Sequence, residues 1–373
     1  MNILILNWRD KSHPKSGGAE IVTFEHARHW VKMGHHVTWL TSWYDGALHT
    51  ERIDGITIQR RLGSLKIYVY VPWHLLFHGK EYDVIVDEVH GIPFFSPFFT
   101  STPVVMFIHE IAGEIWDFMY PFPINVVGKL LESLYFRIYR SHKIWTDAPS
   151  MVSEIIKRGI EEKNCIAIPC PISVDRKNST HLMGYEKEKS PTYIFVSRVV
   201  KMKGIEEVIK AFSFIRKEQK NARLWIIGSG EISYIEELQL MMKEYGILDR
   251  TTFLGKVTEK EKFEYMSKAH LLLHASVKEG WGLVVLEAAY AGTPSIVYNV
   301  PGLRDVVHDK ETGIVIPDNS PMEMAQAAVR LIEDKKRYES MRVKGRAWVD
   351  SLKWDDVAIK SIQVLKSAIK QST

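Results

Sequence analysis

Short apolar segments alternate with longer segments of helical periodicity through the first part of the chain. The short segments are rich in β-branched residues, as buried parallel strands are, and they comprise residues 2–6, 36–40, 83–87, 104–108 and 143–147. Apolar residues recur at helical spacing in residues 19–34 and 125–141, which predicts helices between the strands. This alternation predicts a doubly wound α/β domain.

The same alternation returns after an interruption. Residues 169–191 are rich in proline, serine and charge and have no period, which indicates an interdomain linker at 171–190. Further strands are then expected at residues 192–197, 223–228, 251–255, 270–275 and 294–298. We therefore expect two Rossmann-like domains with parallel sheets, residues 1–170 and 191–354. Ligands of such sheets bind outside the carboxyl ends of the strands, so the expected site is the cleft between the domains.

Composition and charge narrow the class of protein. Hydrophobic residues make up 46% and charged residues 25% of the chain, as in soluble globular proteins, and a net charge of +4 gives no argument for nucleic acid. Cys165 and Cys170 are too few for a disulfide framework, and buried free thiols favour the cytoplasm. The pattern of the N-terminal residues predicts a strand rather than a signal peptide. Prolines interrupt the longest stretch without acidic or basic residues, so no membrane-spanning helix is expected.

Two cations follow the strand expected at 192–197. Arg198 and Lys203 lie just before a predicted helix, where a guanidinium and an ammonium suit a diphosphate. The alternative is a pair of solvated surface cations, but their position at the end of a strand favours the diphosphate. The Gly-Ser-Gly turn at 228–230 would let the backbone approach a ligand or would merely allow close packing, and the sequence favours neither.

The segment "KEGWGLVVLEAAYAG", residues 278–292, places a glutamate at either end of an apolar run. A helix is expected at 282–291, closed by Gly292, and Glu287 is its one polar residue, a lone buried carboxylate that needs partners. Glu287 lies roughly 7–8 Å past a helix N-terminus that can hold an anion. That offset is similar to the one between a diphosphate and its ribose. Glu279, before the helix, would then reach whatever the diphosphate carries.

Five segments together carry a family resemblance. They are "NWRDKSHPKSGGAE" with its Gly-Gly pair, "VVMFIHE" ending beside a histidine, "FVSRVVKMKG", the E-x7-E pattern "EGWGLVVLE", and "AGTPSIVYNVPGLRDVVHDKETGIVIP". In this order they resemble the retaining glycosyltransferases of the GT-B fold, family 4, over nearly the whole chain. The departures are Pro301-Gly302 where the family often has Gly-Gly, Asp305 where it has glutamate, and Trp281 where phenylalanine is commoner.

The resemblance implies a fold and a set of site residues. The fold would be two Rossmann-like domains facing a central cleft, with the C-terminal helix 355–373 returning to the first domain and permitting closure. The implied catalytic residues are His109, Glu279, Arg198 and Lys203. The implied substrate-binding residues are Gly17, Gly18, Gly228, Gly280, Trp281, Gly282, Leu283 and Glu287.

The resemblance also implies what each group does. Arg198 and Lys203 would hold the donor diphosphate, and Glu287 would bind the ribose. Glu279 and the backbone after it would contact the donor sugar. His109 would lie beside the anomeric carbon, while the glycine pair of the first domain would close over the phosphates.

Neither a metal nor a cofactor is expected beside the nucleoside-diphosphate sugar. The chain has no Asp-x-Asp motif, so Arg198, Lys203 and a helix N-terminus would stabilise the leaving diphosphate. His109 is not part of a His-Glu-x-x-His zinc motif. No nucleophile is evident opposite His109, which favours same-face transfer with retention. His90, also at a strand end, is as well explained by structure as by function.

The first domain is expected to bind the acceptor, a glycan, glycolipid or lipid-linked precursor of cell-surface glycoconjugates. Aromatic residues gather in segments 68–77, 93–99 and 115–123, more than one core needs. Basic residues on and near one amphipathic helix suggest peripheral contact with anionic lipid at the inner face of the membrane: Lys129, Arg137, Arg140 and Lys143. The alternative, which we favour, is that this helix covers the sheet and its cations are solvated.

Three other functions are weighed. A GT-B sugar-nucleotide epimerase or hydrolase would turn over the donor without an acceptor. A nicotinamide-dependent oxidoreductase is disfavoured because Gly-x-Gly-x-x-Gly does not follow the first strand. A non-catalytic nucleotide-binding protein is disfavoured because every expected catalytic residue is present. The sequence does not specify the base, the sugar, the acceptor or the oligomeric state.

Overall fold

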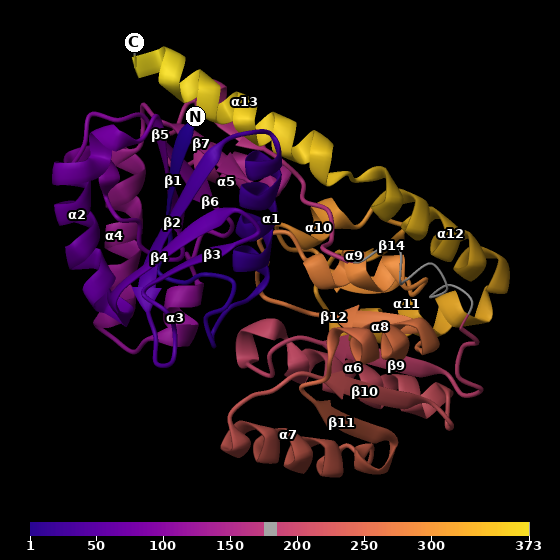
Figure 1. Cartoon of the computed structure of the whole chain (residues 1–373). Coiled ribbons are helices and arrows are strands. Elements are labelled where there is room, and N and C mark those ends of the chain that lie inside the picture. Colours follow the sequence, from indigo (N-terminus) through magenta and orange to yellow (C-terminus); the bar gives the residue numbers. More distant parts are fainter. Residues whose placement is uncertain (175–184, 373) are drawn as a thin grey trace. The chain divides into compact units, whose positions relative to one another are not determined.

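The chain folds as two compact units. The computed structural model describes residues 1–174 and 185–372, so half of the linker expected at 171–190 lies outside the described residues. Unit 1 comprises Met1–Ser173 and Leu352–Thr373, and unit 2 comprises Val174–Ser351. Each unit is built around its own sheet (Figure 1).

The sheet of unit 1 has the strand order β3-β4-β2-β1-β5-β6-β7-β8, and all neighbours except β3 and β4 are parallel. Its strands are β1 (Asn2–Leu6), β2 (His36–Trp43), β3 (Thr50–Ile53), β4 (Ile56–Gly63), β5 (Val84–Val89), β6 (Val104–Ile108), β7 (Lys143–Thr146) and β8 (Cys165–Ala167). β5 and β6 are buried at every position, as their continuous hydrophobicity predicts.

The hairpin of β3 and β4 was not among the predicted elements. Its strands are joined by Asp54-Gly55, both at positive φ, and β3 alternates exposed and half-buried residues. β3 is an edge strand with the sequence Thr-Glu-Arg-Ile, so it lacks the apolar run that identified the other strands. Short, polar edge strands of this kind give little hydrophobic signal.

Helices cover both faces of this sheet. They are α1 (Gly18–Lys32), α2 (Ile67–His78), α3 (Ile115–Met119), α4 (Ile124–Ile138), α5 (Pro149–Ile156) and α13 (Trp354–Ser372), with short 3-10 turns η1 (Ser64–Lys66), η2 (Gly79–Glu81), η3 (Ser96–Phe98) and η4 (Glu162–Asn164). The connections through α2 and α4 cross the sheet in the direction opposite to that through α1, so right-handed crossovers place them on the opposite face. Figure 1 shows α2 and α4 on one side of the sheet and α1 on the other.

The C-terminal helix α13 packs on α1 within unit 1. Ser361 of α13 accepts a hydrogen bond from the indole of Trp30 at 2.9 Å and lies 3.1 Å from the ring of His26. Both partners belong to α1 and are buried. The last helix therefore completes the core of the unit that contains the first strand.

Unit 2 has a parallel sheet of order β11-β10-β9-β12-β13-β14. Its strands are β9 (Thr192–Val196), β10 (Arg223–Ile227), β11 (Thr251–Gly255), β12 (Leu271–His274), β13 (Ser295–Tyr298) and β14 (Gly313–Ile316). Its helices are α6 (Ile205–Glu218), α7 (Ile232–Glu244), α8 (Glu259–Lys268), α9 (Leu283–Tyr290), α10 (Leu303–Val306), α11 (Pro321–Glu333) and α12 (Lys335–Ser351), with turns η6 (Lys201–Lys203) and η7 (Leu248–Arg250).

The predicted α/β class with two parallel-sheet domains is confirmed, and the element bounds differ by a few residues. The helix expected at 282–291 is α9, and it begins after Gly282 at φ +83° and is closed by Gly292 at φ +73°. The helix expected at 19–34 ends at Lys32, because Gly34 adopts φ +85°. In the described part of the chain, no helix combines the length and apolarity that crossing a bilayer requires.

Each sheet has a point where the strand order reverses, and in open α/β sheets ligands bind there, outside the carboxyl ends of the strands. In unit 1 this switch point lies between β1 and β5. In unit 2 it lies between β9 and β12. The expected site residues follow these strands or their neighbours.

The basic residues expected on and near α4 have different surroundings. Lys143 lies in β7, in agreement with the strand expected at 143–147, and donates hydrogen bonds to Lys163 O and Asn164 Oδ1. Lys129 is on α4 but pairs with Asp117. Arg137 is exposed near the end of α4, and Arg140 is exposed just after it. Sequence proximity had grouped cations whose side chains have different partners.

Candidate functional site

The switch point of unit 2 brings Lys203 and Glu279 into direct contact. Lys203 ends the turn η6 after β9, and Glu279 lies in the loop after β12. Lys203 Nζ donates to Glu279 Oε1 at 2.6 Å, and His274 Nε2 lies 3.0 Å from the same oxygen. Burial alone would raise the pKa of Glu279, but the charge of Lys203 and the hydrogen bond from His274 lower it well below its ordinary value. Glu279 is therefore an anion held between two donors.

Glycines let the strand ends approach one another closely here. A Cβ on Gly228 would lie 1.7 Å from Ser197 O, and one on Gly204 would lie 1.9 Å from Ala275 O. Both residues have positive φ, so two independent constraints require glycine. At Gly228 close packing against Ser197 O is therefore enough to explain why the residue is glycine. Its expected role toward a ligand stays a prediction.

Arg198 is placed differently from Lys203. It follows β9 directly and is exposed, and nothing in residues 1–174 or 185–372 forms an ion pair with it. The backbone around it is fixed, since Val199 N donates to Ser229 O at 2.8 Å. Its guanidinium is thus free to meet an anion at the same end of the sheet.

The N-terminus of α9 follows Glu279 within four residues. Gly282 has φ +83°, and Trp281 before it is buried while Gly280 and Leu283 are half-buried. Gly302 lies behind this turn, where a Cβ would lie 2.4 Å from Glu279 O. The Pro301-Gly302 departure from the family therefore keeps the glycine that the close contact requires.

Glu287 has the partner that a buried carboxylate needs. Lys262 of α8 lies 2.9 Å from Glu287 Oε1, and the two side chains are 12% and 21% exposed. Lys262 also pairs with Glu259 one turn earlier on α8. Burial raises the pKa of Glu287, and the charge of Lys262 opposes that rise. Helix α8 supplies the partner, which no feature of the segment 278–292 indicates.

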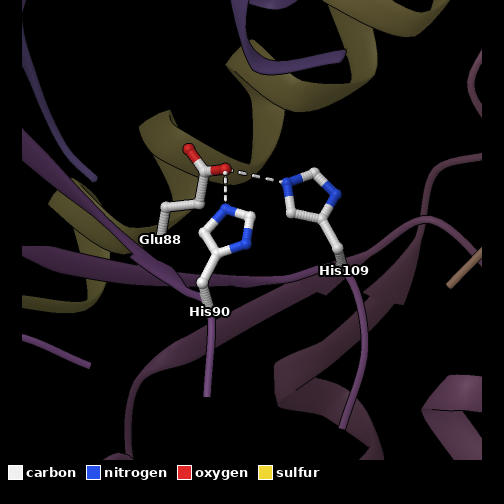
Figure 2. Close-up of side chains that lie close together, drawn as sticks. All are labelled: Glu88, His90 and His109. Atoms are coloured by element: carbon white, nitrogen blue, oxygen red, sulfur yellow. Dashed lines mark hydrogen bonds and ion pairs between the residues drawn. The ribbon is translucent and has the colours of Figure 1, made fainter. Parts of the chain in front are cut away.

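In unit 1 the corresponding strand ends gather around His109, which follows β6. Figure 2 shows one oxygen of Glu88, from β5, facing ring nitrogens of both His90 and His109. Glu88 Oε1 lies 2.9 Å from His90 Nε2 and 3.0 Å from His109 Nε2. On its other side, His109 Nδ1 lies 2.6 Å from Oδ2 of Asp147, which follows β7. His109 therefore bridges two buried carboxylates.

These contacts shift the pKa values strongly. Burial would lower the pKa of His109, but the charges of Asp147 and Glu88 and their hydrogen bonds outweigh it and raise the value to about 10. Burial would raise the pKa of Glu88, but the hydrogen bonds from His109 and His90 lower it to about 2. The partners of the His109 ring are thus carboxylates rather than backbone groups.

Glu20, on the first turn of α1, contacts both the loop that contains Gly17 and the cluster around His109. Gly17 N donates to Glu20 Oε2 at 2.6 Å, and Arg9 pairs with Glu20 Oε1 at 2.7 Å. His90 Nε2 lies 3.6 Å from the same Glu20 oxygen. Gly17 and Gly18 themselves are exposed. The expected phosphate-closing role of this pair stays a prediction.

Glu88, His90 and His109 also have the proximity of a metal-binding group, since one ligand atom from each lies within 4.8 Å of the others. The short contacts in the cluster are accounted for without an ion, because a carboxylate accepts hydrogen bonds and each ring nitrogen facing it can donate. The metal-free site stays a prediction.

Four residues of these clusters were missed by the sequence analysis. They are Glu88, Asp147, His274 and Lys262. Glu88 is the last but one residue of β5, Asp147 directly follows β7 and His274 ends β12, so position relative to a strand end was the available signal. Lys262 lies on an ordinary charged helix and gave no signal.

A cavity of about 510 Å³ lies elsewhere in unit 2. Its lining includes Lys210 of α6, Glu244 of α7 and Met322 of α11. None of the expected site residues lines it. The cavity therefore gives no argument about the strand-end clusters.

Family profiles match both units. The profile described as Glycosyltransferase Family 4 matches residues 16–176, and the one described as Glycosyl transferases group 1 matches residues 184–348. The two matches cover successive parts of the chain and correspond closely to the two units.

Curated relatives are glycosyltransferases and a synthase. The chain is 32% identical over 190 residues to the GDP-mannose-dependent alpha-(1-6)-phosphatidylinositol monomannoside mannosyltransferase of Mycobacterium tuberculosis. The alignment covers 49% of each of the two chains. It is 24% identical over 345 residues to the N-acetyl-alpha-D-glucosaminyl L-malate synthase of Bacillus anthracis, covering 90% of this chain and 89% of the relative. The aligned part spans only about half the length of the mannosyltransferase and of two inositol-phosphate glycosyltransferases.

Solved structures share the fold. Sucrose-phosphate synthase from Thermosynechococcus elongatus has a TM-score of 0.78 at 19% identity and covers 98% of both chains. The HepE protein of Anabaena, solved with UDP-glucose, has a TM-score of 0.74 at 18% identity and covers 98% of this chain and all of its own. With both family profiles and this shared architecture, the chain belongs to the glycosyltransferases of the GT-B fold, family 4 type.

Proposed function

We propose that this protein transfers a sugar from a nucleoside-diphosphate sugar to a hydroxyl acceptor. The observation that carries the proposal is the contact of Lys203 with Glu279 at the switch point of unit 2, directly before the N-terminus of α9. An ammonium has three donors, so Lys203 can keep Glu279 and still donate to a phosphate. The exposed Arg198 adds a second cation at the same strand end.

In this proposal each group meets one part of the donor. Lys203, Arg198 and the first amides of α9 hold the diphosphate and stabilise its growing charge as the glycosidic bond breaks. Glu279, kept ionised, accepts hydrogen bonds from hydroxyls of the donor sugar. Glu287 accepts from the ribose, and Lys262 fixes its orientation. His109 contacts the donor sugar, as the family pattern assigns it.

We further propose retention of configuration without a metal. Two cations and a helix N-terminus supply the positive charge that a divalent ion supplies in other sugar transferases. Retention by same-face attack fits a site in which the leaving diphosphate stays bound beside the acceptor hydroxyl. The named relatives are transferases and a synthase, and none of them favours the epimerase or hydrolase alternative.

The proposed acceptor is a glycolipid or lipid-linked glycan presented at a membrane surface. The mannosyltransferase relative is named for a phosphatidylinositol acceptor. In unit 1, α2 turns Val69, Trp73, Leu76 and Phe77 to solvent, with Phe77 68% exposed, and has no acidic residue. Such a face suits the headgroup boundary of a bilayer.

The helix α4 supports the same contact. Its exposed apolar residues include Val127, Leu130 and Leu134, and Arg137 and Arg140 are exposed toward and just past its end. α2 and α4 cover the same face of the sheet, and cations beside apolar side chains match an anionic lipid surface. The proposed location is therefore the cytoplasmic face of a membrane, reached peripherally.

The donor assignment is tested by thermal unfolding with UDP, GDP and ADP and their sugars. Binding to the folded state raises Tm by mass action, so we expect one nucleotide series to shift Tm and Lys203→Ala to abolish most of the shift. Lys201→Ala, an exposed cation in the same turn, is the control. An unchanged shift in Lys203→Ala would remove Lys203 from the site, and no shift with any nucleotide would refute the donor class.

The membrane contact is tested by co-sedimentation with phosphatidylglycerol vesicles. Trp73→Ser combined with Phe77→Ser should reduce binding several-fold by removing exposed apolar area. Ile232→Ser, at an exposed apolar residue of unit 2, is the control. Equal binding by all three proteins would refute the assignment of this face, and binding to a soluble protein partner alone would point away from lipid.

A further inference from the structure

We propose that Glu88 and Asp147 hold His109 as an imidazolium, so that His109 cannot act as a base, and that Glu88 is a positioning residue for sugar transfer. The inference rests on the proposed function for its link to catalysis. The protonation of His109 itself rests on the geometry of unit 1 alone.

The geometry requires two protons on the ring. His109 Nε2 is 3.0 Å from Glu88 Oε1, and Nδ1 is 2.6 Å from Asp147 Oδ2. An ionised carboxylate only accepts hydrogen bonds, so each ring nitrogen must donate. A neutral imidazole has a single N–H and would leave one nitrogen lone pair facing a carboxylate in a buried site.

Each carboxylate is itself held in place. Asp147 Oδ1 accepts from the Cys170 thiol at 3.1 Å, which turns Oδ2 toward His109. Glu88 Oε1 faces His90 as well as His109, and both Glu88 and Asp147 are buried. The ring of His109 packs against Phe107 at 4.0 Å between centroids, which fixes its plane. The ring therefore has a defined orientation as well as a defined charge.

The other titratable groups close to the His109 cluster among residues 1–174 and 185–372 include His26, His90, Glu20 and Cys170. His26 of α1 lies close by and is buried, and burial lowers its pKa well below the ordinary value, so it is neutral. Glu20 of α1 is paired with Arg9. His90 Nε2 lies 2.9 Å from the same Glu88 oxygen and 3.2 Å from Asn7 Nδ2. Burial raises the pKa of Cys170, so its thiol stays protonated. Glu88 and Asp147 thus dominate the field at the ring.

The consequence is a restricted role for His109. With both N–H bonds directed at carboxylates, it has no lone pair to take the proton of the acceptor hydroxyl. Its part is to present a fixed ring beside the donor sugar. The two negative charges of Glu88 and Asp147 outnumber the single positive charge of this ring. A net negative cluster favours the positive charge that develops on a sugar ring as the leaving group departs.

The charge is tested by Glu88→Gln, which keeps the side-chain size and both hydrogen bonds. We expect the ¹⁵N signals of His109, assigned with His109→Gln in ¹⁵N-histidine-labelled protein, to show an imidazolium from about pH 6 to 9 in the native chain. In Glu88→Gln the titration should move to lower pH by at least about one unit. A neutral His109 at pH 7 in the native chain would overturn the inference.

The catalytic link is tested by the pH profile of kcat/KM with the donor and acceptor found above. The alkaline limb should move from above about pH 9 to below about pH 8 in Glu88→Gln, with kcat falling more than KM changes. Asp147→Asn is the second variant, should Glu88→Gln fold poorly, and the exposed Glu114→Gln is the control. An unchanged profile in a folded variant would overturn the positioning role.

Two further outcomes distinguish a protonated His109 from a metal site and from a failure of the proposed function. Loss of activity with EDTA and its return with Mn²⁺ or Zn²⁺ would overturn it, because the three facing side chains would then be ligands of an ion. The ¹⁵N measurement needs no substrate. An imidazolium signal in a protein that transfers no sugar would therefore support the geometry of the cluster while refuting the proposed function.

Discussion

The two strand-end clusters have opposite charge arrangements. In unit 1 a cation, His109, lies between the anions Glu88 and Asp147. In unit 2 an anion, Glu279, lies between Lys203 and His274, with Arg198 exposed nearby. Taken as charged groups, the first cluster is net negative and the second net positive. Only the second is suited to a diphosphate, although both occupy the switch point of a parallel sheet.

The two clusters also differ in how far their side chains are exposed to solvent. Glu88 and Asp147 are buried, and Glu88 Oε1 and Asp147 Oδ2 face the His109 ring of their own unit. In unit 2 Arg198 is exposed, and Glu279 and Gly280 before α9 are half-buried. A closed network holds the orientation of one ring, whereas an open one can exchange water for ligand. The same topology therefore serves two different tasks.

The largest expected effect comes from the glycine that lets β9 and β10 meet. Gly228→Ala should lower the free energy of unfolding by about 2–4 kcal/mol, because its Cβ would overlap Ser197 O and the residue has φ +141°. Gly246→Ala has positive φ but open space around its Cβ, so it should lower the free energy by only about 1 kcal/mol. Urea unfolding measures the free energy of unfolding of both variants. Equal losses in the two would show that the close contact of residue 228 with Ser197 O does not determine stability.

The second effect distinguishes the clusters by pH. His109 has a folded pKa of about 10 against an ordinary 6.5, so its stabilisation is complete below about pH 6.5 and is lost as pH rises toward 10. The slope approaches ~1.4 kcal/mol per pH unit, which predicts a fall of about 2–3 kcal/mol in the free energy of unfolding between pH 7 and 9. His109→Gln should flatten this slope, as followed by urea unfolding at each pH.

Glu279 supplies the contrasting case. Its folded pKa is lowered, so its stabilisation is present above the ordinary value and is lost as pH falls through the acid range. Glu279→Gln should therefore change the acid side of the stability profile and leave the alkaline slope intact. An alkaline slope that disappears in Glu279→Gln rather than in His109→Gln would reverse the assignment.

The third prediction concerns transition-state stabilisation at the positive cluster. Lys203→Ala should lower kcat/KM by about 1.5–3 kcal/mol, roughly 10- to 150-fold, because a charged hydrogen bond to the leaving diphosphate is lost. Lys203→Arg retains the charge and should recover part of the rate. Steady-state kinetics at saturating acceptor measures the effect, and an unchanged kcat/KM in Lys203→Ala would leave the positive cluster without a catalytic role.

The smallest effect is expected at Glu287. Lys262→Met should lower nucleotide affinity about 3- to 10-fold, since Glu287 loses its partner and is more readily protonated. Glu259→Gln removes only the exposed pair on α8 and is the control. Isothermal titration with the nucleotide measures both variants. Equal affinity in both would show that Lys262 does not orient Glu287 for the ribose.

Local features of the sequence located many of the elements and indicated candidate site positions. Continuous apolar runs gave β1 and β6 their observed bounds, and a glycine at each end of an apolar segment located α9. Cations just past a strand end indicated Arg198 and Lys203, whereas His109 came from the family resemblance, and the roles of all three stay predictions. These are local signals, because a buried strand or a helix cap depends on neighbouring residues along the chain.

Only the tertiary structure decided which groups those residues meet. The partners of His109 lie 21 and 38 positions away, and Lys203 and Glu279 are 76 positions apart. The pairing of Lys262 with Glu287 depends on how α8 packs beside α9, and no periodicity in either helix encodes it. Hydrophobic pattern specifies which face of an element is buried, whereas charge and protonation depend on groups that packing brings together from distant parts of the chain.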